Sequence, residues 1–563
     1  MCRVLIGLLV VGAWLPAAHA AAQVSEARLA ELVRQAQTLA GAQAPGGTTP
    51  AVPSPPAAQT PGVDLTVDDA VTRALENNLD IAVERLNPQA IDYSIAALEG
   101  VYQPVVNSTL GQNNVVQLPT SQLVGGQQVS TDTSTYNLGF SQAMPWYGGS
   151  FLVGWNNRRQ ESTNAFNTFN PQYNTTLLAS YTQPLLRGMT IDLTRQQLLV
   201  TRINREVSEL QLRGTVTNTV ANVRNAYWDL VAAIQAVEVA RRSLSLAEKL
   251  VEDNRMRVEI GTLAPIDVVQ AEAEAANRRL SLTQAEAAWR TAELALKRLI
   301  VDGTQDPLWS STLNPVDRPG AGPPVVDITA AVRRALTERT DLLQARKQLD
   351  SSTVTVRFLR NQTLPVADLV ASYGVQGIGG TRFLRQGIGG DIIGSIPGGY
   401  EDALDLLRRA DYPSWNLQLQ LAYPLGTSAA DASYARARLQ VTQTHAQIRA
   451  LELQVATEVT NAALQVQSNL QRVEAARAAR ELAERQLEAE ESKFEVGMST
   501  NFLVVQFQRD LFDAQINELR ARLDYQKSLV DFDRVQQTAG RATSIAAVTT
   551  AEAGGATATS GTR

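Results

Sequence analysis

The chain of 563 residues contains one cysteine, Cys2, and two histidines, His19 and His445. Cys2 and His19 lie in a segment that we expect to be removed, and His445 lies within a long helical pattern. Phosphate-binding loops, Gly-x-Ser-x-Gly motifs and clusters with metal-ligand spacing are also missing. The sequence therefore predicts no catalytic residue, no cofactor and no metal, and argues against an enzyme.

Long apolar runs and basic clusters are missing as well. After the first 20 residues, no apolar run reaches the roughly 18 residues that a membrane-spanning helix needs, so only β-strands could cross a bilayer. The net charge of −6 is mixed along the chain, which argues against a nucleic-acid partner.

The N-terminus has the pattern of a secretory signal peptide, which we place at residues 1–20. Arg3 precedes the apolar run Val4–Leu15, and Ala18-His19-Ala20 fits the cleavage pattern. The apolar run is too short for a membrane anchor, and Cys2 lacks the context of a lipidation site, so we expect an unlipidated protein beginning near Ala21. Residues 21–63 form an N-terminal extension with a proline-rich linker.

Glycine and proline are absent from Asp431–Val496 and from Met498–Ala539. Within the first segment, apolar residues recur at threes and fours, as in Ile448, Leu451, Val455 and Val459. We predict a helix of about 65 residues, roughly 100 Å long, that turns at Gly497 and returns for about 40 residues. A compact globular domain does not need a helical hairpin of this length.

Strand patterns interrupt the helical ones. Residues 101–184 are rich in Asn, Thr, Ser, Gly and aromatic residues, and residues 365–424 contain the clearest alternation. One face of that strand is expected to point to lipid: Trp415, Leu417, Leu419, Leu421 and Tyr423. Residues 377–413 are expected to form a long glycine-rich loop.

The order helix, strands, long helix, turn and shorter helix occurs twice. Ala74-Leu75 corresponds to Ala335-Leu336, Gln183-Pro184-Leu185 to Tyr423-Pro424-Leu425, and Gly261 to Gly497, which indicates duplication. We place the first repeat at 64–300, with strands at about 101–184 and a helical hairpin at about 190–300. A connection at 301–326 leads to the second repeat at 327–540, with strands at about 365–424 and a hairpin at about 428–539. Residues 541–563 are expected to be a disordered tail.

Four clear strands, with an extra hairpin left open at residues 136–156, cannot close a membrane barrel alone, because closed barrels need about eight strands. Several chains must then share one β-barrel, and their helical rods must share one α-helical tube.

Taken together, the chain resembles the TolC-like outer-membrane efflux proteins over Asp64–Ala539. The segments that carry this resemblance are Leu75-Glu76-Asn77-Asn78-Leu79-Asp80, Gln183-Pro184-Leu185-Leu186-Arg187-Gly188, Val496-Gly497-Met498-Ser499-Thr500 and Gln508-Arg509-Asp510-Leu511. The resemblance implies a homotrimer with a twelve-stranded barrel in the outer membrane lipid and a periplasmic tunnel. It also implies a periplasmic adaptor (membrane fusion) protein and an inner-membrane pump as partners, and export of solutes or unfolded proteins.

The two helical turns are the expected periplasmic tip. We expect the adaptor to dock on the turn residues Gly261, Thr262, Leu263, Gly497, Met498, Ser499 and Thr500. By resemblance, Asp267 and Phe494 would form the tunnel gate, whereas Leu503 and Gln506 stand where better-known family members carry aspartates. Leu263 and Met498 are expected to be exposed, Thr500 to cap the returning helix, and Pro265 to lie in a first helical turn. Each of these residues could also serve only to build a tight helical hairpin.

Two alternatives stay open at this point. A coiled-coil structural protein of the cell envelope would explain the helices but not the alternating strands. The strand aromatics Trp155, Tyr173, Tyr181, Trp415 and Tyr423 could form membrane-interface girdles or ordinary strand packing.

Overall fold

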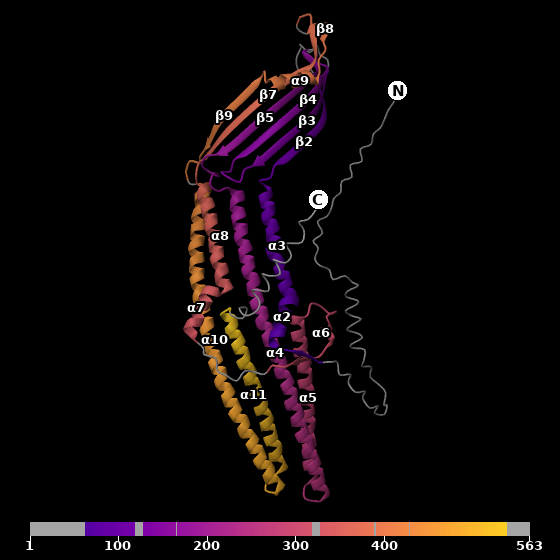
Figure 1. The fold of residues 1–563 in the computed structure, drawn as a ribbon, viewed down its shortest axis with the longest axis vertical. Coiled ribbons are helices and arrows are strands. Elements are labelled where there is room, and N and C mark those ends of the chain that lie inside the picture. The colour runs from indigo at the N-terminus through magenta and orange to yellow at the C-terminus, as the bar shows by residue number, and fades with distance from the viewer. Residues whose placement is uncertain are drawn as a thin grey trace, which may run out of the picture. The chain divides into compact units, whose positions relative to one another are not determined.

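The computed structural model describes residues 62–118, 128–164, 166–317, 327–387, 390–426 and 428–537. The expected signal peptide, proline-rich linker and C-terminal tail lie outside these residues, apart from the last residues of the linker. The described residues form the predicted fold class, mainly helical with a β-sheet, and they contain the two repeats (Figure 1).

The first repeat runs from a helix pair through four strands to a long helical hairpin. Its elements are β1 (Val63–Leu65), α2 (Val67–Asn77), α3 (Leu79–Gly100), β2 (Val105–Gln117), β3 (Val129–Ala143), β4 (Ser150–Ser162), β5 (Phe169–Pro184), α4 (Leu193–Glu259) and α5 (Pro265–Ile300).

The second repeat follows the same order after a short connection. Its elements are α6 (Pro307–Ser310) and β6 (Leu313–Pro315) in the connection, then α7 (Ile328–Glu338), α8 (Thr340–Gln362), β7 (Val366–Arg385), β8 (Ile392–Ile396), α9 (Tyr400–Arg409), β9 (Pro413–Ala422), α10 (Ala429–Glu495) and α11 (Asn501–Val535). The long helices α4 and α10 have 67 residues each.

Local sequence explains where the long helices begin. Asp192 caps α4 by accepting from the backbone N–H of Arg195 at 2.7 Å. Ser428 caps α10 and forms a capping box with Asp431. These side chains satisfy backbone donors that have no partner inside the helix.

The helical segments that enter each set of strands are broken, which their patterns did not predict. The first breaks at Asn78, whose buried side chain accepts from the backbone of Asp80 and Ile81 and donates to the carbonyl of Leu299 at 3.0 Å. The second breaks at Arg339, at the equivalent place in the repeat.

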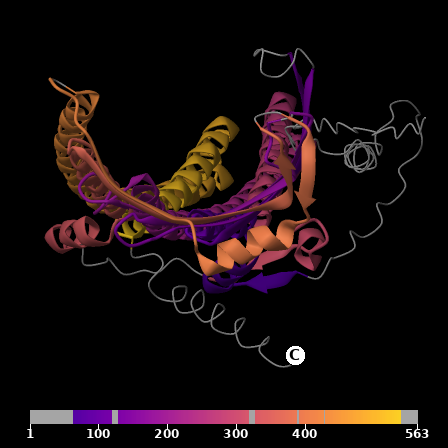
Figure 2. The same ribbon diagram turned by 90° about the horizontal axis from the view of Figure 1, so that it is seen from above.

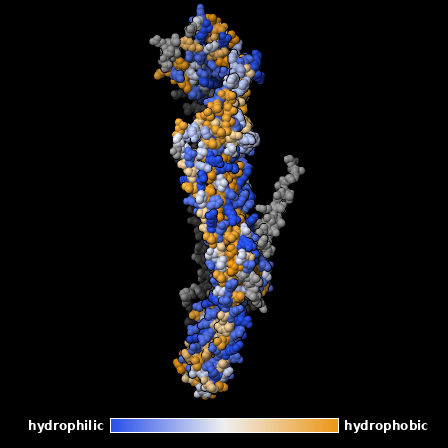
Figure 3. Space-filling view, turned by 90° about the vertical axis from the view of Figure 1, so that its left-hand side faces the viewer, coloured by the Kyte–Doolittle hydropathy of each residue, from blue (hydrophilic) through white to orange (hydrophobic). Residues whose placement is uncertain are grey.

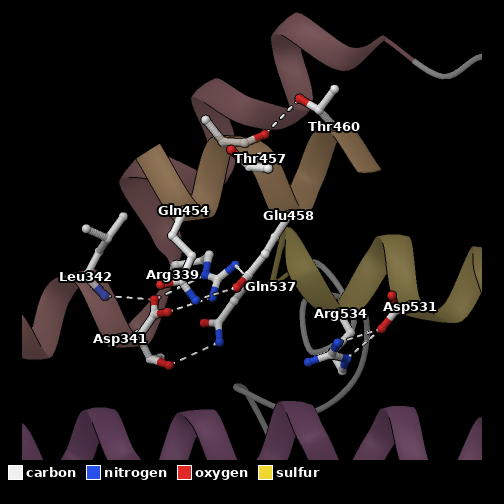
Figure 4. A network of polar contacts seen from close by, with 12 residues as sticks. Arg339, Asp341, Leu342, Gln454, Thr457, Glu458, Thr460, Asp531, Arg534 and Gln537 are labelled. Carbon is white, nitrogen blue, oxygen red and sulfur yellow. Dashed lines mark hydrogen bonds and ion pairs between the residues drawn. The ribbon is translucent and has the colours of Figure 1, made fainter. Parts of the chain in front are cut away.

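Figure 4 shows the polar network at this second break. The guanidinium of Arg339 donates to Glu458 of α10 at 2.6 Å and to Asp341 at 2.6 Å. Burial raises the pKa of Glu458, but the hydrogen bonds from Arg339 and Gln454 and the charge of Arg339 together outweigh burial and hold the pKa below its usual value. The network therefore fixes the junction of α7 and α8 to the middle of α10.

The main sheet is antiparallel and has the order β2-β3-β4-β5-β7, with β9 and β8 pairing to different ends of β7. At the helical end of the sheet, six strands therefore lie side by side. Residues 136–156, whose place was open, belong to β3 and β4 and are part of this sheet. Seen from above, the sheet curves like a trough, and α9 lies on its convex side (Figure 2).

The expected glycine-rich loop at 377–413 is wrong in part, because it contains the end of β7, β8 and α9. Glycine is needed here for close packing: a Cβ at Gly377 would come 1.9 Å from the carbonyl oxygen of Ala403 in α9, and one at Gly379 would come 2.3 Å from that of Gly399. These glycines let the helix lie directly on the strand.

Apolar clusters hold the helices together at three levels. The largest surrounds Tyr227, which is fully buried and donates to the carbonyl of Leu65 at 2.9 Å. Through this contact the β1–β6 pair, a small parallel sheet that the sequence did not predict, is attached to α4. The other two clusters join α7, α8 and α10 at mid-height, and both hairpins near their turns.

Candidate functional site

The six-stranded part of the sheet has one apolar face. Directly paired residues of neighbouring strands lie on the same face, so the register assigns each side chain to one side. The apolar residues of this face include Val106, Leu110, Tyr136, Leu138, Phe140, Phe151, Val153, Trp155, Leu177, Ala179, Tyr181, Leu369, Ala371, Tyr373, Trp415, Leu417, Leu419 and Leu421.

The opposite face is mostly polar or small. It includes Asn107, Thr109, Thr135, Asn137, Gly154, Asn156, Thr176, Ser180, Thr182, Asp368, Ser372, Gln376, Asn416, Gln418 and Gln420. Apolar residues also occur on it, among them Val105, Val115, Leu152, Leu178, Val366 and Val370. Such a sheet suits a wall with lipid on one side and water on the other.

The predicted lipid-facing residues lie on this apolar face. β9 covers Pro413–Ala422, so Tyr423 lies one residue beyond the strand. Leu417, Leu419 and Leu421 are 62%, 54% and 68% exposed in the single copy. In Figure 3, which faces the side of β9, hydrophobic residues gather at the level of the sheet.

The strand aromatics are in two environments. Trp415 and Tyr181 are exposed, as a girdle residue would be. Trp155 and Tyr173 are partly covered: the Trp155 indole donates to Thr175 at 3.0 Å, and the Tyr173 ring lies 6.0 Å from that of Tyr400 in α9. These two aromatics therefore also take part in packing beneath α9.

Both outer strands of the sheet have free edges within the described residues. Every residue of β2 and of β9 is exposed, and each strand pairs on one side only. Unpaired edges of this length are a template for pairing with a further strand.

The two hairpin turns have the same backbone conformation. Gly261 and Gly497 have φ of 82° and 79°, in the left-handed region. The N–H of Thr262 donates to the carbonyl of Arg257 at 2.9 Å, and that of Met498 to the carbonyl of Lys493 at 2.8 Å. Both turns are thus Schellman motifs, in which glycine avoids the clash that a Cβ would cause.

The side chains of the predicted docking tip are only partly as expected. Met498 is 77% exposed, but Leu263 is half-buried rather than exposed. Thr500 is the N-cap residue of α11, yet its side chain makes no capping hydrogen bond, so that expectation is wrong, whereas Pro265 occupies the first turn of α5 as predicted. Ser499 donates instead to the buried carboxylate of Glu490.

The two hairpins of one copy are joined near the tip. The amide of Asn254 donates to the side chain of Asn501 at 2.8 Å, and Asn501 donates to the backbone carbonyl of Asp267 at 3.2 Å. The Arg257 guanidinium lies 4.3 Å from the centre of the Phe494 ring, a cation–π contact. Phe494 is buried and makes its contacts within the copy.

One buried carboxylate reinforces this junction. Glu274 of α5 pairs with Arg278 at 2.6 Å and with Arg509 of α11, whose Nε lies 2.8 Å away. Burial alone would raise the pKa of Glu274, but the two guanidiniums hold it below its usual value. Gln506 and Leu503, about one and two turns before Arg509 on α11, are both exposed.

The described ranges contain no group of side chains with the composition of a metal site. Across the same residues, no helix combines the length and hydropathy that crossing a membrane requires.

The outer membrane efflux protein family matches residues 150–300 and 331–535, which include β4, β5, most of the second repeat and both hairpins. The chain belongs to this family. As an outer membrane efflux protein, it is an outer-membrane channel for transport, and this argues against the alternative of a coiled-coil structural protein.

Solved outer-membrane channels share the fold. The CmeC channel of Campylobacter jejuni matches with a TM-score of 0.61 and 14% identity, over 86% of this chain and 88% of its own. A membrane protein from Pseudomonas aeruginosa matches with a TM-score of 0.61 and 18% identity, over 88% and 97%. VceC of Vibrio cholerae matches with a TM-score of 0.59 and 15% identity, over 84% and 96%. No curated protein matches the chain in sequence.

Sequence reasoning missed several residues of this outer membrane efflux protein. The hairpin left open at residues 136–156 covers parts of β3 and β4, but the sequence did not fix that it belongs to the main sheet. No local pattern could have revealed the contact of Asn254 with Asn501, because the two residues are 247 positions apart.

Proposed function

We propose that this protein is the outer-membrane channel of a tripartite efflux or type I secretion system and works as a homotrimer. Three copies share one β-barrel in the outer membrane, and their helices form one periplasmic tunnel. A periplasmic adaptor docks at the tip and connects the tunnel to an inner-membrane pump, so that cargo passes through passively. No catalytic step is part of this function.

The observation that carries the proposal is the two-faced sheet with two free edges. β-structure in a bilayer must close, because unpaired backbone groups have no water to bind there. One copy offers a curved wall with an apolar and a polar face but has no means of closing on itself. When copies join edge to edge, the backbone groups of both edges form hydrogen bonds. The apolar face then meets lipid, and the polar face meets water.

The tip supports the adaptor as a partner. Four large apolar side chains surround the two turns and stay in water in the single copy: Ile260 at 77%, Val496 at 71%, Met498 at 77% and Phe502 at 62% exposure. The backbone hydrogen bonds of the Schellman motifs already hold the turns, so these side chains are not needed for the fold. In a trimer the turns would form a ring of six, a repeating surface for a repeating partner.

The gate is proposed at Asp267 and Phe494. Phe494 fixes α10 against Arg257 of α4, and the backbone of Asp267 fixes α5 to Asn501 of α11. The Asp267 side chain remains half-exposed in the first turn of α5, from which it could reach a neighbouring copy.

Met498→Glu tests the docking surface. Met498 is highly exposed, so a charge there should leave folding intact, whereas a side chain at Gly497 would strain the turn itself. We expect Met498→Glu to form trimers normally but to lose export and adaptor co-purification, with Met498→Leu as the matched control. Normal export by Met498→Glu would show that the tip is not the docking surface.

A further inference from the structure

We propose that each copy contributes six strands to the barrel wall, so that the trimer has eighteen, with β2 of one copy pairing with β9 of the next. This inference rests on the proposed trimer and extends it, because the resemblance implied four strands per copy. The family match begins at residue 150, so the hairpin β2–β3 lies outside the part of the chain that the family describes.

The β2–β3 hairpin is fully integrated in the sheet. β2 pairs with β3 along its whole length, from Val105 to Gln117, and β3 pairs with β4 at both of its ends, from Thr131 to Ala143. The two strands have 13 and 15 residues, at least the 10 of β9. Both are long enough to span a membrane, for which a tilted strand needs about 9–11 residues.

The apolar face continues across the hairpin. Leu110 lies opposite Tyr136, Leu138 opposite Trp155, and the ring of Phe140 lies 5.5 Å from that of Phe151. Leu110 is 75% exposed in the single copy. An accessory hairpin in water would have no use for this face, whereas a membrane wall requires it.

The strand directions allow closure at this edge. β2 leads away from the helices, following α3, and β9 leads back towards them, into α10. An edge-to-edge contact between copies is therefore antiparallel, and an even number of strands per copy keeps this alternation around the ring. The apolar side chains of both edges would fall on the same outer face.

The seam is the contact between neighbouring copies in the barrel. The alternative seam pairs β4 of one copy with β9 of the next, and leaves four strands per copy in the wall. In this structure the edge of β4 is already occupied by β3 over most of its length. A β4–β9 seam would have to break that ladder and leave the hairpin unpaired. Because barrel diameter grows roughly linearly with strand number, eighteen strands would make a pore about 1.5 times as wide as twelve.

Disulfide crosslinking in the full-length protein distinguishes the two seams. Val106→Cys, Ser108→Cys or Leu110→Cys in β2 is combined with Leu417→Cys, Leu419→Cys or Leu421→Cys in β9. Paired residues in adjacent strands lie about 4.5–5.5 Å apart, within reach of a disulfide. We expect at least one combination to give crosslinked dimers and trimers on oxidation. Thr109→Cys with Leu419→Cys, on opposite faces, is the control that should not link.

The outcomes separate this inference from the proposed function. A crosslink between Val153→Cys in β4 and a β9 cysteine, or trimers that never crosslink through β2, would overturn the six-strand wall and leave the trimer standing. A purely monomeric protein would overturn both.

Arginine substitution provides a test that does not depend on crosslinking. Leu110→Arg should lower the yield of heat-stable trimer by about tenfold or more relative to Thr109→Arg, because only Leu110 would face lipid. Equal yields would place β2 outside the membrane wall.

Discussion

Replacing Leu419 by arginine should impair assembly of the channel, and the structure sets the size of the effect. Leu419 lies on the apolar face opposite Leu369, between Trp415 and Tyr423. At about 3.4 Å per residue and a strand tilt near 40°, four residues correspond to roughly 10 Å along the membrane normal. If the two aromatics mark the interfaces, Leu419 lies near the middle of the hydrocarbon layer.

At that depth an arginine costs about 2–4 kcal/mol, which corresponds to a decrease of roughly 30- to 1000-fold in the ratio of inserted to uninserted protein. Gln418→Arg is the matched control, because Gln418 lies opposite Val370 on the polar face. A charge there meets water and should change stability by no more than about 0.5 kcal/mol.

A heat-stability gel measures the outcome as the fraction of trimer that survives graded heating, and detergent extraction of the outer membrane measures insertion. We expect Leu419→Arg to lose trimer at lower temperature and to accumulate outside the membrane, while Gln418→Arg behaves as the native protein. If the two variants behave alike, the assignment of lipid and water to the two faces is wrong.

The remaining predictions concern the tip and the mature chain. Because the paired state holds the pKa of Glu274 below its ordinary value of 4.5, its contribution to stability is complete above that value and is lost as the pH falls through the lowered pKa. Limited proteolysis should therefore show the native tip loosening only below about pH 4.5, and Glu274→Gln should be looser at neutral pH with a flatter profile; identical profiles would contradict this. Asp267→Ala keeps the backbone bond to Asn501 but should raise conductance in a planar bilayer, and unchanged conductance would leave Asp267 with a helix-dipole role alone. Intact-mass measurement should show a mature protein beginning near Ala21, and a diacylglycerol adduct or a retained Met1 would contradict it.

The sequence predicted those parts of the fold that have a regular period. The helical hairpins follow from apolar residues at threes and fours without glycine or proline, and β9 follows from ten residues of strict alternation. Pro265 and the two turn glycines mark the hairpin ends correctly, because their backbone requirements are local.

Other features depend on contacts that no short window contains. Glycine usually indicates a loop, but at Gly377 and Gly379 its missing Cβ lets α9 pack on the strand, and so the segment was mistaken for a loop. The breaks at Asn78 and Arg339 lack glycine and proline, and are stabilised by Leu299 and Glu458 from distant parts of the chain. β2 falls within the predicted strand region, but its alternation is weaker than that of β9, because Ser108, Gln112 and Asn114 share the face of Val106 and Leu110.

The position of α9 also determines how high the bilayer can reach along the wall. The exposed side of this helix carries Glu401, Asp402, Asp405, Arg408 and Arg409, which are costly in hydrocarbon. The lipid tails must therefore end below the place where α9 lies on Gly377. On β7, Gly377 lies four residues, roughly 10 Å, beyond Tyr373, the partner of Trp415, so the band between the aromatics Trp415 and Tyr423 ends below α9. One short helix and two glycines would thus set the depth at which the whole channel sits in its membrane.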